Sequence, residues 1–488
     1  MQQDTLSLDS ASYTITPEQD GDTSSPFRID LPMRAFDNNF HVNLKRMYDY
    51  LNVKYISPKF IYPLSTIAGD GGDGKKNAPH FIHSSSNHQF PPIRREGCGY
   101  AEWILRMAYL AVFYFWFTTC CFFIRPKPAT GSNEDESLRH YLERIRIPRH
   151  FSRHYLLPLM SSVTTCSHDA LLNFPAIDCV EYAKRTYRQP HYVAVEGVQE
   201  VQTKIANGRD IRFGATVTAV ENTGSRVRVS WTENNDETKK VNSTVFDHVI
   251  MAVPPNVVGA IYQPLQGVLD HIPVAFGESV VHRDTSTIPD CGRSLKRPSP
   301  SQPPSSSTSS SFLDHPQIMH ICSTPSSTES IHEHPSSILV TNFPISPIDP
   351  TKVIHRARFT RVLRTPKSRA LVERIFSRDS NLNARHDHGE KKDLSWRNGD
   401  GNVWLVGAWC WDGMVLLEGC VVSAMRVASD LGVDVPWRVE GWYMHIYIHT
   451  YTSAFLDSLG AFQCRFCLLS RTWAEESLET GMISNACI

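Results

Sequence analysis

Residues 402–431, NVWLVGAWCWDGMVLLEGCVVSAMRVASDL, decide the fold of this chain. The stretch opens on an apolar run, residues 403–406, that is broken by Gly407. This pattern indicates a short buried strand whose end requires a close approach of the backbone. From Met414 onward apolar residues recur at helical spacing, and Gly432 is placed to end that helix. The stretch therefore predicts a strand, a glycine turn and a helix.

The start of the predicted helix, between Gly413 and Val415, is a candidate for ligand contact. The first N–H groups of a helix have no intrahelical partner, and the helix dipole adds positive charge there. Such a helix end suits an electron-rich ligand edge. A strand-to-helix corner that binds no ligand fits the same pattern, because glycine turns are common.

Length and composition describe an ordinary globular chain. With 488 residues, 41% of them hydrophobic, the chain can bury a large core, and we expect two closely joined lobes. A charged content of 20% and a formal net charge of -1 give no basic excess. We therefore predict that the protein binds no nucleic acid.

The cysteine pattern and the N-terminus predict a reducing environment. The twelve cysteines show no repeating spacing, and the first residues, MQQDTLSLDS, lack the pattern of a signal peptide. We therefore expect a cytosol-facing location without a signal peptide. The single C-x-x-C motif, Cys464 to Cys467, has no second pair, so we predict no metal site.

The most hydrophobic stretch runs from Ala108 to Ile124 and has basic residues on both sides, at Arg106, Arg125 and Lys127. Its length is at the lower limit for a transmembrane helix. A single crossing would place the parts before and after it on opposite sides of a membrane. We therefore prefer membrane association through a helix that dips into one leaflet or packs near a lipid-facing entrance. A buried core helix is the alternative.

The 402–431 stretch resembles the C-terminal flavin-contacting motif of the flavin-containing amine oxidase superfamily. In that family a strand ends in a glycine, and a helix with a Glu-Gly turn faces the flavin ring. Gly407, Gly413, Glu418, Gly419 and Ser423 stand in the corresponding places. Many family members carry an acidic residue where this chain has Ala408. The resemblance implies that FAD is the cofactor and that its contacts from this stretch are Gly407, Ala408, Gly413, Met414, Val415 and Glu418.

Three further positions carry the same resemblance. Residues 30–34 follow the pattern D-x-P-x-R, which in the family lies against the cofactor, so Arg34 is implied as a contact to pyrophosphate or flavin. A solvated arginine near a helix start is the alternative. Residues 246–256, FDHVIMAVPPN, resemble the family's buried strand and Pro-Pro turn. A backbone contact to the adenine is implied at Val217.

One unit of the resembled family is missing. A dinucleotide-binding lobe opens with a strand, a G-x-G-x-x-G turn and a helix, and we find no such unit here. We predict an α/β fold in which an N-terminally incomplete FAD/NAD(P)-binding Rossmann-like lobe is interleaved with an α+β substrate lobe. The predicted regions are an FAD-lobe remnant (1–65), a flexible loop (66–99), a helical region contacting substrate or membrane (100–190), FAD-lobe strands (191–287), a disordered Ser/Pro-rich insertion (288–337), a substrate-lobe strand with the C-terminal FAD motif (338–435) and a tail of uncertain structure (436–488).

Two functions remain open. The first is a membrane-associated, FAD-dependent oxidoreductase of the amine oxidase type that transfers a hydride from an apolar, lipid-like or amine substrate to flavin. The second is a cofactor-free scaffold that acts as a binding or structural protein, which the missing glycine turn favours. No catalytic base is assigned, because histidines such as His41, His191 and His282 stand in no motif. The serines occur in no G-x-S-x-G motif, so a hydrolase is unsupported.

Overall fold

The computed structural model describes residues 11–15, 27–67, 76–84, 97–129, 134–234, 238, 240–289, 316–334, 337–376 and 396–438. The chain divides into two units, residues 1–436 and 437–488, and every element below lies in the first. Apart from residues 436–438, the predicted tail lies outside the described residues, and so does the C-x-x-C motif.

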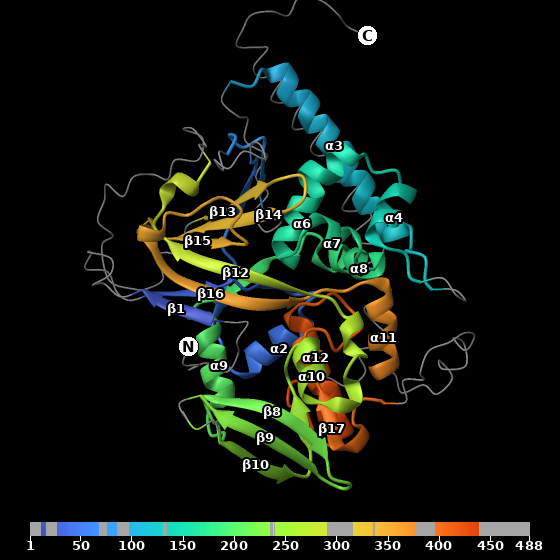
Figure 1. Cartoon of the computed structure of the whole chain (residues 1–488). Coiled ribbons are helices and arrows are strands. Elements are labelled where there is room, and N and C mark those ends of the chain that lie inside the picture. Colours follow the sequence, from blue (N-terminus) through green and yellow to red (C-terminus); the bar gives the residue numbers. More distant parts are fainter. Residues whose placement is uncertain are drawn as a thin grey trace, which may run out of the picture. The chain divides into compact units, whose positions relative to one another are not determined.

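A seven-stranded mixed sheet is the largest sheet of the first unit (Figure 1). β13 pairs in parallel with β5, and the other neighbouring strands pair antiparallel. Every residue of β13 is buried, which indicates that the sheet is covered on both faces there. The strand order is β16 (Val353–Val362), β12 (Val274–His282), β15 (Leu339–Asn342), β14 (Thr328–Glu333), β13 (Gln317–Ser323), β5 (Phe60–Thr66) and β6 (Phe81–Ser84).

Two regions predicted to be irregular contain strands. The insertion predicted as disordered over 288–337 includes β13 and β14, and the flexible loop predicted over 66–99 includes β6. Composition misled the prediction, because the Ser/Pro run masked two segments that become buried on pairing. The polar strand β14 is tolerated in the interior because the Glu329 carboxylate pairs with the Lys76 ammonium at 2.6 Å and accepts from the Ile345 and Ser346 N–H groups.

Helix α3 (Tyr100–Phe123) contains most of the apolar stretch that was predicted to contact a membrane. By length and composition alone α3 could cross a membrane. Only 22% of its most apolar window is buried inside the protein, so most of this apolar stretch is not covered by the rest of the fold. β5 and β6 precede α3 and β12 follows it, yet all three strands lie in one sheet. The chain on both sides of α3 is therefore on one side of any membrane, as the topological argument from the sequence requires.

The helices after α3 pack beside it and against the sheet. α3 contacts α8, and α6 contacts β13 and β14. Their apolar side chains form one core cluster with residues of α3, β5 and β6. These helices are α4 (Leu138–Arg144), α5 (Arg149–Phe151), α6 (Leu157–Thr164), α7 (His168–Leu172) and α8 (Ala176–Thr186).

A second core cluster surrounds a two-stranded parallel sheet, β11 (Val249–Met251) with β17 (Val403–Leu405). It includes residues of α10 (Pro255–Ile261), α11 (Pro366–Phe376) and the antiparallel sheet of β8 (Ala215–Asn222), β9 (Val227–Glu233) and β10 (Val241–Phe246). β11 was predicted as a buried strand, but its central residue Ile250 is 50% exposed. The reason is that β11 pairs, within the described residues, with β17 alone.

The N-terminal residues add two small sheets and two helices. β1 (Ala11–Ile15) pairs with β2 (Phe27–Leu31), although residues 1–28 were predicted as loop. β7 (His191–Ala194) lies between β3 (Ala35–Asp37) and β4 (Tyr55–Ile56). The helices are α2 (Val42–Tyr50) and α9 (Gly197–Ala206).

Glycines at residues 69, 71 and 74 stand in the order G-x-G-x-x-G, but their context is not that of a dinucleotide-binding turn. β5 precedes them, and β6 rather than a helix follows. Residues 68–75 themselves lie outside the described part of the chain.

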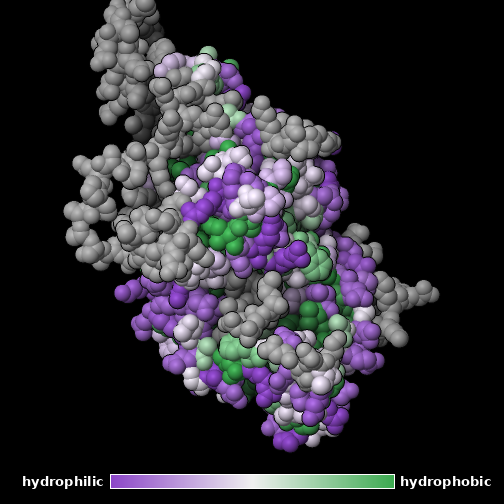
Figure 2. All heavy atoms as spheres, turned by 60° about the vertical axis from the view of Figure 1, so that its left-hand side comes forward, coloured by the Kyte–Doolittle hydropathy of each residue, from purple (hydrophilic) through white to green (hydrophobic). Residues whose placement is uncertain are grey.

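On the face shown in Figure 2, apolar residues form separate patches among hydrophilic ones, as is common for folded proteins.

Candidate functional site

The candidate site is the loop between β17 and α12 (Leu417–Asp430), which we call the motif loop, residues 406–416. The strand and the helix predicted for this stretch are both present, but the helix begins at Leu417 rather than between Gly413 and Val415. Leu416 has an extended backbone, and its N–H donates to the Met414 carbonyl at 2.8 Å. The predicted helix end therefore lies nearer to Glu418 than to Gly413.

Trp411 explains the late helix start. Its indole Nε1 donates to the Met414 carbonyl at 3.0 Å, which folds the motif loop around the ring. A Cβ at Gly413 or at Gly419 would lie 2.6 or 2.4 Å from that ring. Both glycines are therefore required by the packing of Trp411, which the sequence pattern did not reveal.

The end of β17 is held against α12 by Ser423. The hydroxyl of Ser423 accepts from the Gly407 N–H at 2.9 Å. Gly407 has φ +147°, a conformation that favours glycine. Ser423 and Gly407, both implied by the resemblance, are thus brought together, and Ala408 and Val415 pack with the core cluster around β17.

Glu418 joins the motif loop to α2. Its buried carboxylate accepts from the backbone N–H of Asn43 at 2.9 Å and of Leu44 at 3.0 Å, and from Asn43 Nδ2 at 2.7 Å. It thereby caps the first turn of α2, where a carboxylate is favoured. Burial raises the pKa of Glu418, although these hydrogen bonds oppose the rise. Two segments separated by more than 370 residues are joined by this one side chain.

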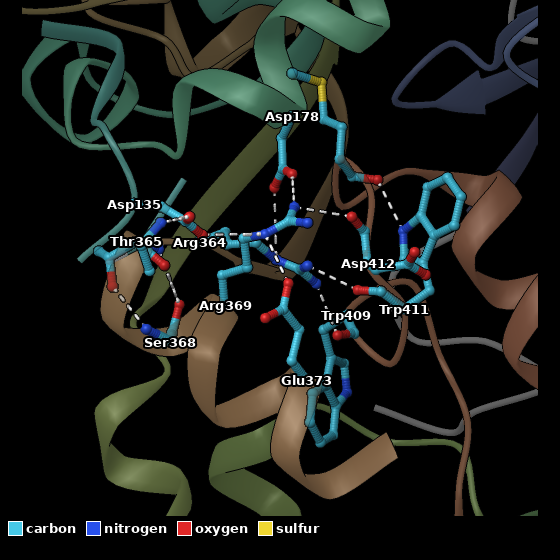
Figure 3. Close-up of polar contacts among 12 residues, drawn as sticks. Asp135, Asp178, Arg364, Thr365, Ser368, Arg369, Glu373, Trp409, Trp411 and Asp412 are labelled. Carbon is cyan, nitrogen blue, oxygen red and sulfur yellow. Dashed lines mark hydrogen bonds and ion pairs between the residues drawn. The ribbon is translucent and has the colours of Figure 1, made fainter. Parts of the chain in front are cut away.

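A buried network of arginines and carboxylates fixes the other side of the motif loop (Figure 3). The guanidinium of Arg364 is 2% exposed and donates to the carbonyls of Trp409 at 2.8 Å and Trp411 at 2.7 Å. Its Nε lies 3.9 Å from Asp178 on α8. Arg369 on α11 pairs with Asp178 and donates to the Asp412 carbonyl at 2.9 Å. Arg364 and Arg369 thus bond to the loop, and Asp178 of α8 lies against both guanidinium groups.

Burial raises the pKa of Asp178, and the guanidinium groups of Arg364 and Arg369 oppose that rise. Asp135 at 3.3 Å and Glu373 at 3.0 Å add further negative charge around Arg369. Sequence reasoning missed the network, because its members come from separate segments. The only sequence signal was an arginine, Arg364, directly after the apolar end of β16.

Arg34 lies between β2 and β3, and Val217 lies in β8. The pKa of Asp30 is raised, because burial is the largest cause of its shift. The positive charge of Arg34 opposes that rise. Asp30 itself accepts from the Val198 N–H at the start of α9. Val217 is 40% exposed at an irregular point of the β8–β9 pairing, and Val220 of the same strand packs in the cluster around β17.

His41 lies beside Glu418 but is committed to a structural pair. Its Nδ1 lies 2.7 Å from the Asp37 carboxylate, and both side chains are buried. Asp37 also accepts from the N–H groups of Asn39 and Phe40. The largest single cause, burial, raises the pKa of Asp37, but the contacts with His41 and the two N–H groups together outweigh it, so the pKa is lowered. His282, the other buried histidine considered from sequence, lies in β12 of the seven-stranded sheet.

The residues present fit one end of FAD better than the other. The motif loop offers glycine backbone at Gly407 and Gly413 beside a fixed helix start, which suits the ring end of a flavin. For the pyrophosphate end, the described residues provide Arg34 but no strand, glycine turn and helix. The α9 start is already capped by the Asp30 carboxylate, which would repel a phosphate.

One known protein family matches part of the chain. Residues 133–275 match the family described as flavin containing amine oxidoreductase. The match confirms the resemblance to flavin-containing amine oxidases; of the stretches that carried it, the match includes Val217 and residues 246–256 but not residues 30–34 or 402–431. No curated protein matches the chain.

Solved structures with a similar chain path include two oxidases and an isomerase. Cyclohexylamine oxidase from Brevibacterium oxydans IH-35A is 11% identical with a TM-score of 0.43, covering 86% of this chain and 91% of that one. A fatty acid isomerase from P. acnes that produces CLA is 9% identical with a TM-score of 0.48, covering 88% and 92%. Wild-type putrescine oxidase is 12% identical with a TM-score of 0.44, covering 88% and 91%.

Proposed function

We propose that the protein is an FAD-dependent oxidoreductase of the amine oxidase type that acts on an apolar, lipid-like substrate at a membrane surface. The observation that carries this proposal is the bond between Glu418 and the start of α2, because it joins the 402–431 stretch to the helix that follows residues 30–34, and these two stretches resemble the family's flavin-contacting parts. When bound, FAD would accept a hydride from the substrate. Arg34, Gly407, Ala408, Gly413, Met414 and Val415 would hold it, with Glu418 fixing the loop, and Val217 would contact its adenine through the backbone.

The exposed face of α3 supports the membrane part of the proposal. Leu105, Val112 and Phe123 are 71%, 55% and 58% exposed, and no charged residue occurs between Met107 and Ile124. A helix that is apolar on its exposed face as well as on its buried face is favoured in lipid. Because the chain on both sides of α3 lies in one sheet, we propose insertion into one leaflet rather than a crossing.

One observation favours the alternative, a scaffold that binds no cofactor. In the described residues the parallel sheet beside the motif loop has only two strands, and it leaves Ile250 half exposed. A dinucleotide normally binds at the carboxyl ends of a wider parallel sheet. Under this alternative the motif loop is held by Arg364 and Glu418 for stability alone.

The test is FAD binding by the full chain purified in detergent. We expect a visible flavin spectrum that is restored by added FAD after the cofactor is removed. Arg34→Gln should weaken FAD binding about tenfold, the effect of one lost hydrogen bond to a charged group. Arg46→Gln on α2 is the matched control and should bind FAD as the wild type does. A protein that stays colourless with FAD refutes the oxidoreductase and supports the scaffold.

The membrane proposal has its own test. The full chain should float with lipid vesicles that contain anionic lipid, and Val112→Asp on the exposed face of α3 should reduce the floated fraction. Val241→Asp, on the equally exposed strand β10, is the control. Equal flotation of both variants and the wild type would refute insertion through α3.

A further inference from the structure

A row of aromatic side chains leads from the motif loop to α3. Trp411 of the loop meets Phe40 at a ring distance of 5.8 Å, and Phe40 meets Tyr182 of α8 at 5.0 Å. Tyr182 and Tyr62 of β5 both pack against the core cluster that contains Phe40 and Trp411. The row thus begins at the loop that is proposed to hold the flavin ring.

The row continues across the edge of the seven-stranded sheet. Tyr62 and His83 are paired across β5 and β6, with stacked rings 6.0 Å apart. His83 stacks 6.5 Å from Tyr114 of α3. We call these six side chains the aromatic row: Trp411, Phe40, Tyr182, Tyr62, His83 and Tyr114.

Four polar groups of the aromatic row have no hydrogen-bond partner among the described residues. The Tyr114 hydroxyl is buried without a partner. The hydroxyls of Tyr62 and Tyr182 and the ring nitrogens of His83 likewise make no hydrogen bond within the described part of the chain. Buried tyrosine hydroxyls usually find a partner, and an unmade bond is costly. Of the four groups, only the Tyr114 hydroxyl is shielded from solvent, and it marks the place in the row where a ligand would supply a missing partner.

The aromatic row carries no charge at neutral pH. Burial lowers the pKa of His83 to about 4 and raises the pKa of Tyr62 and of Tyr182. Asp37, the carboxylate that helps to raise the pKa of Tyr182, is already bonded to His41 and to two backbone N–H groups. The row therefore offers aromatic surface and neutral hydrogen-bonding groups, but no partner for an ammonium or carboxylate group.

We propose that the aromatic row lines the substrate pocket and selects an uncharged, elongated apolar molecule, such as an acyl chain with one neutral polar group, that enters beside α3. This inference rests on the proposed function, because it names the substrate class of the same site. The neutral polar group would bond to the hydroxyls of Tyr62 and Tyr114, and the apolar chain would lie against the rings. A protonated amine would lose its hydration there without gaining a counter-charge.

The test uses methyl cis-parinarate, an uncharged fluorescent acyl ester, with the full chain in detergent. Tyr114→Phe and Tyr62→Phe each remove one hydroxyl and keep the ring. Both should weaken probe binding about threefold to tenfold, the value of one hydrogen bond. Tyr109→Phe is the matched control, because Tyr109 is also on α3 but its hydroxyl bonds to His150 at 3.3 Å, outside the row. Comparison between variants cancels partition of the probe into detergent.

Competition defines the substrate class. Dodecanol should displace the probe, and dodecylammonium should do so at least tenfold more weakly. Equal displacement by the two, or row variants that bind the probe as the wild type does, would overturn the proposal. Probe binding does not require FAD. A colourless protein that binds the probe through the row therefore refutes the oxidoreductase alone, whereas a flavin-containing protein whose probe binding ignores the row refutes the pocket alone.

Discussion

Replacing Arg364 by methionine should destabilise the protein strongly, because the guanidinium is buried and has several partners. Arg364→Met leaves the carbonyls of Trp409 and Trp411 without their donor and removes one of the two guanidinium groups near Asp178. Loss of one partner from a buried ion pair costs about 3–5 kcal/mol. Since Arg369 still pairs with Asp178, we expect the lower end, about 3 kcal/mol of unfolding free energy.

The assay is urea unfolding of the full chain, followed by the fluorescence of its ten tryptophans, which include Trp409 and Trp411. Arg426→Met is the matched control, because Arg426 also holds the motif loop, through Asp412 at 2.7 Å, but both side chains are largely exposed. An exposed pair contributes under about 1 kcal/mol. If Arg364→Met costs no more than Arg426→Met, the idea that Arg364 fixes the motif loop is wrong.

Two further predictions follow from the packing and the titrating groups. Gly419→Ala should lower the unfolding free energy by about 1–3 kcal/mol, because the added Cβ would meet the Trp411 ring and the Ala408 carbonyl. Gly432→Ala is the control: its added Cβ meets no atom within 4 Å, so this variant measures only the strain of a positive φ. His282, fully buried, has its pKa lowered to about 4 by burial, so its contribution to stability is present above its ordinary pKa and is lost as the pH falls toward 4. Between pH 7 and pH 5 the wild type should lose about 2 kcal/mol relative to His282→Asn in urea unfolding, and parallel curves for the two proteins would contradict this.

The glycine and apolar spacing of residues 402–431 was sufficient to predict a strand, a turn and a helix. The family that this stretch resembles is confirmed by a match over residues 133–275, outside the stretch. The spacing did not give the start of α12, because that start depends on how Trp411 packs against Gly419. Composition failed for β13 and β14. These segments form strands because β13 pairs with β5 and β14 pairs with β15, and such pairing between distant segments cannot be recognised from a local pattern.

The sequence by itself determined which local segments can form, since periodicity, glycine placement and apolar runs act within a few residues of one another. It also favoured a helix that dips into one leaflet over a simple crossing for residues 108–124. Only the tertiary structure decided that Glu418 caps α2, that Arg364 bonds to the motif loop beside Asp178, and which aromatic rings meet between that loop and α3. Each of these contacts joins segments far apart in the chain, so its energy depends on burial, which arises only when the whole unit folds.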